Sequence, residues 1–160
     1  MSSSQEANYL LRMRNKCLAL PFGKYIFSKL FASKAPYFKT IKPVIEQMRP
    51  GYCELTFKKR KPVLNHIGTV HAIALCNGLE MAMGAMAESS IPKHLRWIPK
   101  GMNINYTAKA NSDITVVAEL PNDAWQEGDV AVPVYAKRED GTKVIEGEII
   151  LYVSAKPARK

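Results

Sequence analysis

Apolar residues recur at helical spacing in the first 34 positions of the chain. Between residues 5 and 19 they share one side of a predicted helix, at Ala7, Leu10, Leu11, Cys17 and Leu18. Residues 21–34 repeat the pattern after a proline, which a first helical turn tolerates well. This second stretch is amphipathic and basic, so it suits packing on the core or binding to a membrane surface or a partner.

The spacing of apolar residues changes after residue 41. Residues 52–57 alternate apolar and polar side chains and follow an Arg-Pro-Gly turn, which indicates a strand or a hairpin. Residues 61–70 contain a proline and a glycine, as a loop would. Residues 71–90 are apolar on nearly every face of a helix, apart from Asn77, Glu80 and Glu88. Such a pattern predicts a long helix that is buried.

Four strand-like runs follow Pro92, at residues 102–110, 114–120, 131–139 and 144–153, and short polar turns separate them. The Asp140-Gly141 pair is a strong hairpin signal. The element order predicts one α+β fold, in which an antiparallel sheet of about five or six strands wraps around one long central helix. We divide the chain into an N-terminal helical extension, residues 1–40, and a main domain, residues 41–160. The edges of such a sheet favour edge-to-edge pairing of two copies.

Glu80 is the chemically unusual residue of the long helix. A carboxylate in a buried apolar helix costs several kcal/mol unless it is paired or hydrogen-bonded, and residues 71–87 contain no lysine or arginine. Two interpretations remain open. Glu80 lies on a solvent-facing strip with Asn77 and Gly84, or it lies in a pocket and serves as a general base.

The start of this helix is a second candidate for chemistry. Its first turn has free backbone N–H groups and the positive end of the helix dipole, which suit a carbonyl oxygen or an oxyanion. Asn65 and His71 lie beside it and can donate hydrogen bonds, although hydrogen bonding that only fixes the loop would explain His66 and His71 as well. His71 lies nine residues before Glu80, or roughly 13 Å along one helix. The two side chains would therefore meet only across a dimer.

Charge and composition narrow the classes of partner. The formal net charge is +9, from 23 Lys and Arg against 14 Asp and Glu. A basic surface attracts anions such as nucleic acid, a membrane face or the phosphates of coenzyme A, but the basic residues follow no RNA- or DNA-binding motif. There is no membrane-spanning apolar run, so we expect no stable membrane insertion. Three cysteines without a CxxC spacing indicate reduced thiols in the cytoplasm, and no cluster has metal-ligand spacing.

The stretch NHIGTVHAIALCNGLEMAMG, residues 65–84, resembles the hotdog-fold thioesterases, in the branch of the phenylacetyl-CoA thioesterases. The motif of that family is an Asn or Gln, a Gly-containing loop, His-Gly-Gly, and an acid nine residues after the histidine. Asn65, Gly68, His71 and Glu80 occupy these places. The similarity extends over residues 41–155, and the N-terminal helices are an addition typical of a poorly characterised subgroup.

The resemblance implies hydrolysis of an acyl-CoA or acyl-carrier thioester at the interface of a homodimer or homotetramer. Glu80 would be the general base or nucleophile, His71 would bind near the thioester, and Asn65 would orient water or the carbonyl. The backbone near Gly68, Ala72 and Ile73 would bind substrate. No cofactor is expected, because coenzyme A enters as part of the substrate, and nucleic acid is not an expected partner.

Two positions depart from the family pattern. Ala72 and Ile73 replace two glycines, which narrows the space beside the backbone. Gly84 stands where many relatives have a hydroxyl, and it would leave room for an acyl chain. These departures keep a non-catalytic acyl-CoA-binding protein as the alternative. A third interpretation is a basic membrane-surface protein that uses the 21–34 helix. Met81, Met83, Met86 and Leu79 are either acyl-chain lining or core, and the candidate phosphate ligands are Lys93, Arg96 and Lys109.

Overall fold

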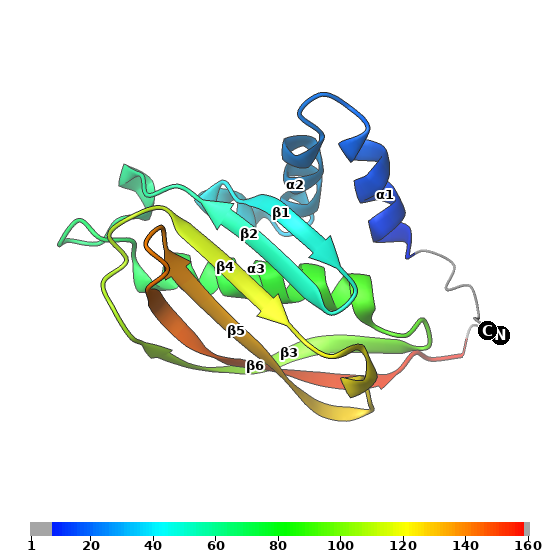
Figure 1. The fold of residues 1–160 in the computed structure, drawn as a ribbon. Helices are drawn as coiled ribbons and strands as arrows, with labels where there is room; N and C mark the ends of the chain where they lie inside the picture. Colours follow the sequence, from blue (N-terminus) through cyan, green and yellow to red (C-terminus); the bar gives the residue numbers. More distant parts are fainter. Residues whose placement is uncertain (1–7, 159–160) are drawn as a thin grey trace.

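The computed structural model describes residues 8–158, and six strands in one sheet curve around a single long helix (Figure 1). The helices are α1 (Tyr9–Leu18), α2 (Gly23–Ser33) and α3 (Ala72–Ser90). The strands are β1 (Val44–Arg49), β2 (Tyr52–Phe57), β3 (Leu95–Tyr106), β4 (Ile114–Glu119), β5 (Gly128–Arg138) and β6 (Lys143–Ala155). Short 3-10 turns are η1 (Pro36–Ile41), η2 (Lys61–Val63) and η3 (Asn122–Ala124).

The sheet has the order β1-β2-β4-β5-β6-β3, and each pair of neighbours is antiparallel. The predicted α+β class and the four strands after the long helix are therefore confirmed. Before that helix the sequence left a strand or a hairpin open, and the structure has the hairpin, β1 with β2. β3 is longer than its sequence pattern indicates, because it begins at Leu95 and continues through Pro99 with a register shift before Gly101. It lies at one edge of the sheet.

The helix α3 is apolar on most faces because the sheet surrounds most of it. Its core side chains include Leu79, Met81, Met83 and Met86, each with no exposed surface. These residues are core, and they do not line a ligand site. At Gly78 the helix comes so close to the sheet that a Cβ atom would lie 3.0 Å from Val116 Cγ2. Glycine at this position permits the close approach of helix and sheet.

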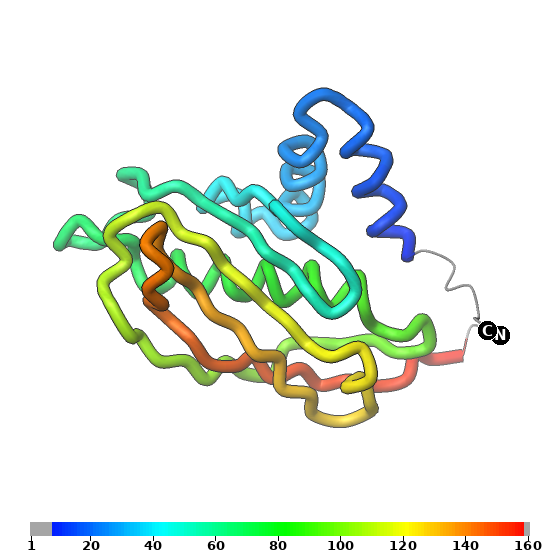
Figure 2. Tube along the Cα trace, viewed as in Figure 1, coloured from blue at the N-terminus to red at the C-terminus, as the bar shows by residue number. Residues whose placement is uncertain are grey.

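The helices α1 and α2 form a hairpin beside the sheet, with the turn between them at its outer end (Figure 2). Helix α2 packs against β1, and its Phe27 is fully buried. Ser28 Oγ also accepts a 2.7 Å hydrogen bond from the backbone N–H of Ile45. The predicted helix over residues 5–19 is present from Tyr9, and residues 5–7 lie outside the described range. The boundary at residue 40 stays a prediction.

Within residues 8–158, none of the helices combines the length and the apolar character that crossing a membrane requires.

Candidate functional site

One strip of α3 is not covered by the sheet, and this strip contains Glu80. Glu80 is exposed, whereas Asn77 and Gly84, one turn to either side, are buried. Asn77 is covered by η1, because its Nδ2 donates to the carbonyl oxygen of Tyr37 and to Thr40 Oγ1. The strip is therefore not uniformly solvent-facing, as one interpretation of the sequence held. Glu80 alone reaches solvent between two covered positions.

Glu80 lines a cavity of ≈ 660 Å³ between α3, the N-terminal helices and the start of β3. This volume lies within the range of small-molecule sites, roughly 300–1,000 Å³. The apolar part of the wall consists mainly of Leu10, Phe31, Phe38, Ile91, Trp97 and Pro99. Lysines from three segments also line the cavity, namely Lys34, Lys93 and Lys156. An acid, an apolar wall and several cations are thus brought together by segments that are far apart in the sequence.

Gly84 contributes open space to this cavity. A Cβ atom at Gly84 would meet only Trp97, at 3.7 Å, which is an ordinary contact. Trp97 is held in place by a 2.8 Å hydrogen bond from its Nε1 to Glu88 Oε1, one turn beyond Gly84. Asn8 Nδ2 donates to the backbone carbonyl oxygen of Glu88, which fastens the start of α1 to the same part of α3. The cavity wall is therefore fixed by hydrogen bonds between distant segments.

The loop before α3 folds upon the side chain of Asn65. Its Oδ1 accepts hydrogen bonds from the N–H groups of Ile67 and Thr69, both at 3.1 Å, and its Nδ2 donates to Thr69 Oγ1 at 2.8 Å. Gly68 has φ +76°, a conformation that glycine adopts without strain. The structure thus gives Asn65 and Gly68 roles in shaping the loop.

His71 is the N-cap of α3. Its Nδ1 accepts a 3.1 Å hydrogen bond from the N–H of Ile73, so the ring proton of the neutral imidazole resides on Nε2. His71 is exposed, and Nε2 is left to donate outwards. The Ile73 N–H is already engaged, and the Ile73 side chain is 51% exposed beside it. Of the two backbone donors that the family resemblance indicates, only that of Ala72 remains a candidate for binding a substrate oxygen.

Glu80 and His71 are not neighbours within one chain. They are separated by nine residues of α3, which is roughly 13 Å of helix. The acid lies at the cavity in the middle of the helix, and the N-terminal donors lie at its end. A single chain therefore presents two half-sites.

Two residues near Glu80 had no signal in the sequence analysis. Cys76 lies one turn before Glu80 and is half-buried, and Tyr106 at the end of β3 is its hydrogen-bond partner. Burial raises the pKa of the Cys76 thiol, while the hydrogen bond with Tyr106 acts in the opposite direction. The thiol therefore stays neutral near pH 7 and is a poor nucleophile. Sequence spacing alone cannot place Tyr106 beside α3, because a sheet register brings it there.

The suggested phosphate ligands differ in position. Lys93 lines the cavity, as does Lys156, whose Nζ donates to the carbonyl oxygen of Lys93. Arg96 instead donates to Ser154 Oγ across strands β3 and β6. Lys109 is exposed in the segment after β3. Lys93 is therefore the one of the three that the cavity includes.

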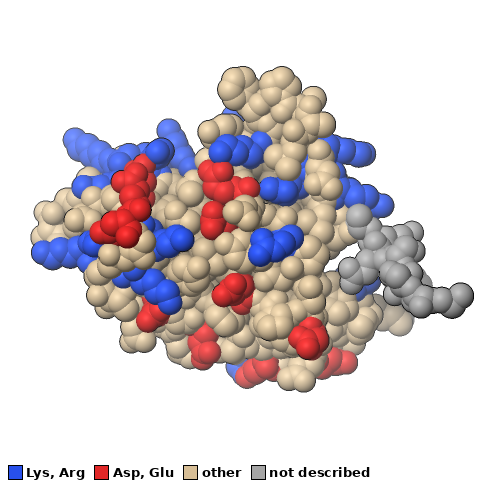
Figure 3. Space-filling model, in the orientation of Figure 1, with Lys and Arg blue, Asp and Glu red and all other residues tan. Residues whose placement is uncertain are grey.

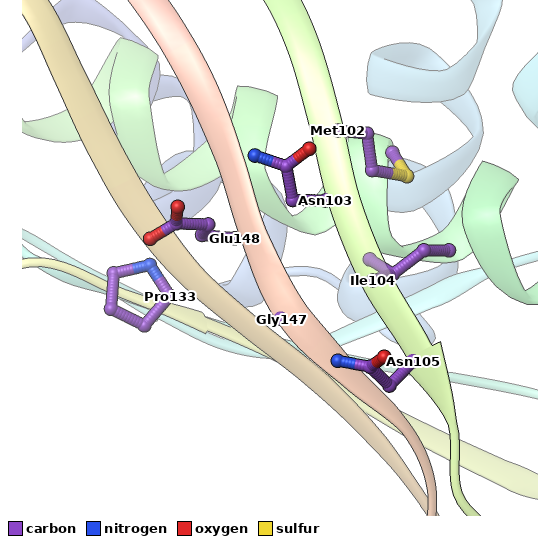
Figure 4. Close-up of a pocket in the computed structure, with 7 residues that line it drawn as sticks. All are labelled: Met102, Asn103, Ile104, Asn105, Pro133, Gly147 and Glu148. Carbon is purple, nitrogen blue, oxygen red and sulfur yellow. The ribbon is translucent and has the colours of Figure 1, made fainter.

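A second hollow lies on strands β3, β5 and β6, with a volume of ≈ 670 Å³ (Figure 4). Asn103, Asn105 and Glu148 supply its polar side chains. All seven lining residues are described, and Glu148 is the one ionisable residue among them. The hollow thus lacks the combination of acid, cations and apolar wall found at Glu80. Elsewhere in residues 8–158, no three His, Cys, Asp or Glu side chains gather into a metal-binding group.

Comparison with protein-family models identifies the chain. Residues 23–153 match the family described as Domain of unknown function (DUF4442). The chain belongs to this family. The matched region begins with α2 and so includes the helix that packs on β1, Glu80 and most of the cavity wall. No curated protein matches the chain.

Solved structures place this DUF4442 member among hotdog-fold proteins. A structural-genomics protein of unnamed function is 45% identical, with a TM-score of 0.81 over 92% of this chain and 99% of its own. A Pseudomonas aeruginosa protein of unknown function, called a probable thioesterase, is 24% identical, with a TM-score of 0.73 over 86% and 97%. A thioesterase family protein from Silicibacter pomeroyi is 18% identical, with a TM-score of 0.69 over 82% and 99%. The resemblance to the thioesterase-type hotdog fold is therefore confirmed.

Proposed function

We propose that this protein is a thioesterase that hydrolyses an acyl-CoA thioester to a carboxylic acid and free coenzyme A. The observation that carries the proposal is the position of Glu80, an exposed carboxylate on the wall of a mainly apolar cavity. The apolar wall suits a fatty or aryl acyl group, and the lysines around the cavity suit an anionic carrier. Similarity of fold to proteins called thioesterases supports the same reaction class.

Glu80 would act as a general base. Its carboxylate takes a proton from water, the resulting hydroxide attacks the thioester carbon, and the C–S bond breaks as the tetrahedral intermediate collapses. The developing oxyanion requires donors, and the Ala72 N–H together with His71 Nε2 provides them at the positive end of α3. In the variant mechanism Glu80 attacks the carbon directly, the C–S bond breaks to release coenzyme A, and water then hydrolyses the mixed anhydride and frees Glu80.

The two half-sites would combine in a homodimer. Because the N-terminal end of α3 lies roughly 13 Å from Glu80 in one chain, the donors must come from a second copy. β3 is a long strand at the edge of the sheet, and such an edge is suited to pairing with another chain. Mixing Glu80→Gln chains with His71→Ala chains tests this arrangement, because shared sites restore turnover in the mixed dimer. Turnover that stays lost in the mixture contradicts a shared site.

The decisive experiment measures thiol release from short, long and aryl acyl-CoA esters, and from acyl carrier protein esters. We expect Glu80→Gln to reduce turnover by roughly 100-fold or more. Glu88→Gln is the matched control, since Glu88 lies two turns along the same strip and a Gln can still accept the bond from Trp97. Equal turnover in Glu80→Gln and wild type would refute the assigned role of Glu80.

A second candidate function is binding of acyl-CoA without hydrolysis. The observation that favours it is the engaged Ile73 N–H beside an exposed Ile73 side chain, which removes one donor from the oxyanion site. Saturable binding of the esters, without thiol release above buffer, would support this function. The expected location is the cytoplasm in either case, on the sequence ground of an odd number of cysteines without CxxC spacing.

A further inference from the structure

The outer surface of the α1–α2 hairpin exposes large apolar side chains. Most of the exposed large hydrophobic residues among those described lie within the first 37 positions. Leu18, Leu20 and Phe22 lie at the turn between the helices and are 42%, 55% and 78% exposed. Tyr25, Ile26 and Leu30 extend this surface along α2. Large contiguous apolar surface on a soluble domain marks an interaction site.

Phe22 is also held in an unfavourable backbone conformation. It has φ 60° and ψ 22°, in the left-handed region that bulky residues avoid. The turn is tight, because a Cβ atom at the next residue, Gly23, would overlap the carbonyl oxygen of Cys17. A glycine at position 22 would remove the strain, yet the chain has a phenylalanine there that is mostly exposed. Folding alone does not explain an exposed aromatic residue at a strained position.

The charge of this region is entirely of one sign. Residues 8–45 contain no Asp or Glu. Their basic residues are Arg12, Arg14, Lys16, Lys24, Lys29, Lys34, Lys39 and Lys42. On the face drawn in Figure 3 the top of the protrusion is free of charged side chains, and Lys and Arg side chains lie around its lower part, with acidic side chains beside them. The apolar tip therefore extends beyond the cations.

We propose that the α1–α2 turn docks on the surface of an anionic lipid bilayer. Leu18, Leu20 and Phe22 would enter the boundary between headgroups and acyl chains, while the lysines around them contact anionic headgroups. This order of apolar tip and cationic flank matches the depth profile of a bilayer. An acidic protein surface would satisfy the cations but would leave the protruding tip without a complementary layer. The inference does not depend on thioesterase activity.

In the proposed docking, the two sides of the hairpin have different roles. Its inner side supplies Leu10 and Phe31 to the cavity beside Glu80, and its outer side faces the lipid. An apolar ligand that leaves the bilayer would meet the cavity behind the same two helices. The chain stays peripheral in this arrangement, because the tip enters only the headgroup boundary.

The test is sedimentation of the full-length protein with vesicles. We expect binding to phosphatidylcholine vesicles that contain phosphatidylglycerol, and at least tenfold weaker binding to phosphatidylcholine alone. Binding should fall as the salt concentration rises from about 0.1 M to 1 M, because the Debye length shortens from about 10 Å to 3 Å. Equal binding to both kinds of vesicle, or no binding to either, would overturn the proposal.

Matched variants locate the docking surface. Leu20→Ser with Phe22→Ser should weaken binding at least roughly tenfold, since two apolar side chains no longer enter the lipid. Tyr152→Ser, at a residue 49% exposed on β6, should not weaken it. Lys16→Glu with Lys29→Glu should abolish the preference for anionic vesicles, whereas Lys61→Glu with Lys109→Glu, outside residues 8–45, should retain most of it.

The variant Phe22→Gly separates a role of Phe22 in folding stability from a role in lipid binding. We expect this variant to melt at a higher temperature than wild type and to bind vesicles more weakly, because strain and anchoring are lost together. Vesicle binding that survives both tip variants would refute the proposal. Binding of an acidic carrier protein that requires Leu20 and Phe22, without vesicle binding, would assign the surface to a protein partner instead.

Discussion

The hairpin of α1 and α2 and the body formed by the sheet and α3 treat charge and apolar surface in different ways. In the body, several cations have acidic partners within the body, as in the pairs Lys58–Asp113 and Arg138–Asp140, at 2.7 Å each. In the hairpin, Lys24 is bridged to Glu46, which belongs to β1 of the body. Among the described residues, the much shorter hairpin exposes seven large apolar side chains, whereas the body exposes five, at Ile67, Ile73, Ile98, Tyr106 and Tyr152. The inner side of the hairpin is therefore part of the folded core, whereas its outer side has the apolar and basic surface of a binding site.

The largest expected effect tests whether the hairpin is part of the folding unit. Phe27→Ala removes a fully buried ring that also lies 6.4 Å from the ring of Phe31. We expect a loss of about 3–5 kcal/mol in the free energy of unfolding, measured by urea denaturation. Tyr25→Ala, on the outer side of the same helix, should change it by less than about 0.5 kcal/mol. Similar losses of stability in the two variants would contradict the conclusion that only the inner side of the hairpin supports the fold.

Two glycines of α3 sharpen the difference between its sheet side and its cavity side. Gly78→Ala places a Cβ atom 3.0 Å from Val116 and 3.1 Å from Phe57, so overpacking should outweigh the gain in helix propensity and cost about 1 kcal/mol. Gly84→Ala meets only Trp97, at 3.7 Å, and should stabilise by about 0.5–1 kcal/mol. Thermal unfolding of both variants measures the signs. Destabilisation by Gly84→Ala would mean that the space beside Gly84 is not open, and stabilisation by Gly78→Ala would mean that the helix is not tightly packed on the sheet there.

Phe22 tests whether the tip costs stability. Phe22→Gly should raise the free energy of unfolding by about 1 kcal/mol, because the residue has φ 60° and little of its ring is buried. Phe22→Ala keeps the positive φ and should give no such gain. Chemical denaturation in the absence of lipid separates the two. A loss of stability in the glycine variant would show that the ring supports the fold.

The smallest effect concerns the balanced charges of the body. The side chain of Arg138, followed by hydrogen bonds from Thr142, lowers the pKa of Asp140 to about 2 from an ordinary 3.8. A lowered pKa in the folded state adds stability above pH 3.8 that is lost as the pH falls towards 2. Asp140→Asn should therefore make the unfolding midpoint less dependent on pH between about 4 and 2. An unchanged pH dependence would show that this pair contributes nothing.

Most of the fold could be predicted from the sequence, because its signals are local. Apolar spacing located the long helix, and alternation with turn residues located five of the six strands close to their positions. The start of β3 is not predicted, because Pro99 and Gly101 interrupt the strand-like pattern at the register shift between them. A strand order in which β3 returns to the edge beside β6 depends on long-range pairing that a local pattern does not contain.

The candidate site was predictable only in part. The sequence alone identifies Glu80, because an unpaired carboxylate in a buried apolar helix is costly. This argument requires no knowledge of the fold. The cavity was not foreseen, since its wall joins residues near 10, 31, 84, 97 and 156 that only the tertiary structure brings together. The hydrogen bonds of Asn65 within its own loop, and the one from the Ile73 N–H to His71, also depend on geometry that the sequence does not contain. The roles of Glu80, His71 and Asn65 in catalysis stay predictions.

The cavity beside Glu80 has a practical consequence for anyone who prepares this protein. Asn8 and Lys156, which lie close to opposite ends of the sequence, both line its wall. Shortening the protein past Asn8, or to a point before Lys156, would therefore remove part of the cavity wall. Assays of such shortened proteins would report on an incomplete cavity, so activity is best measured on protein that keeps both wall segments.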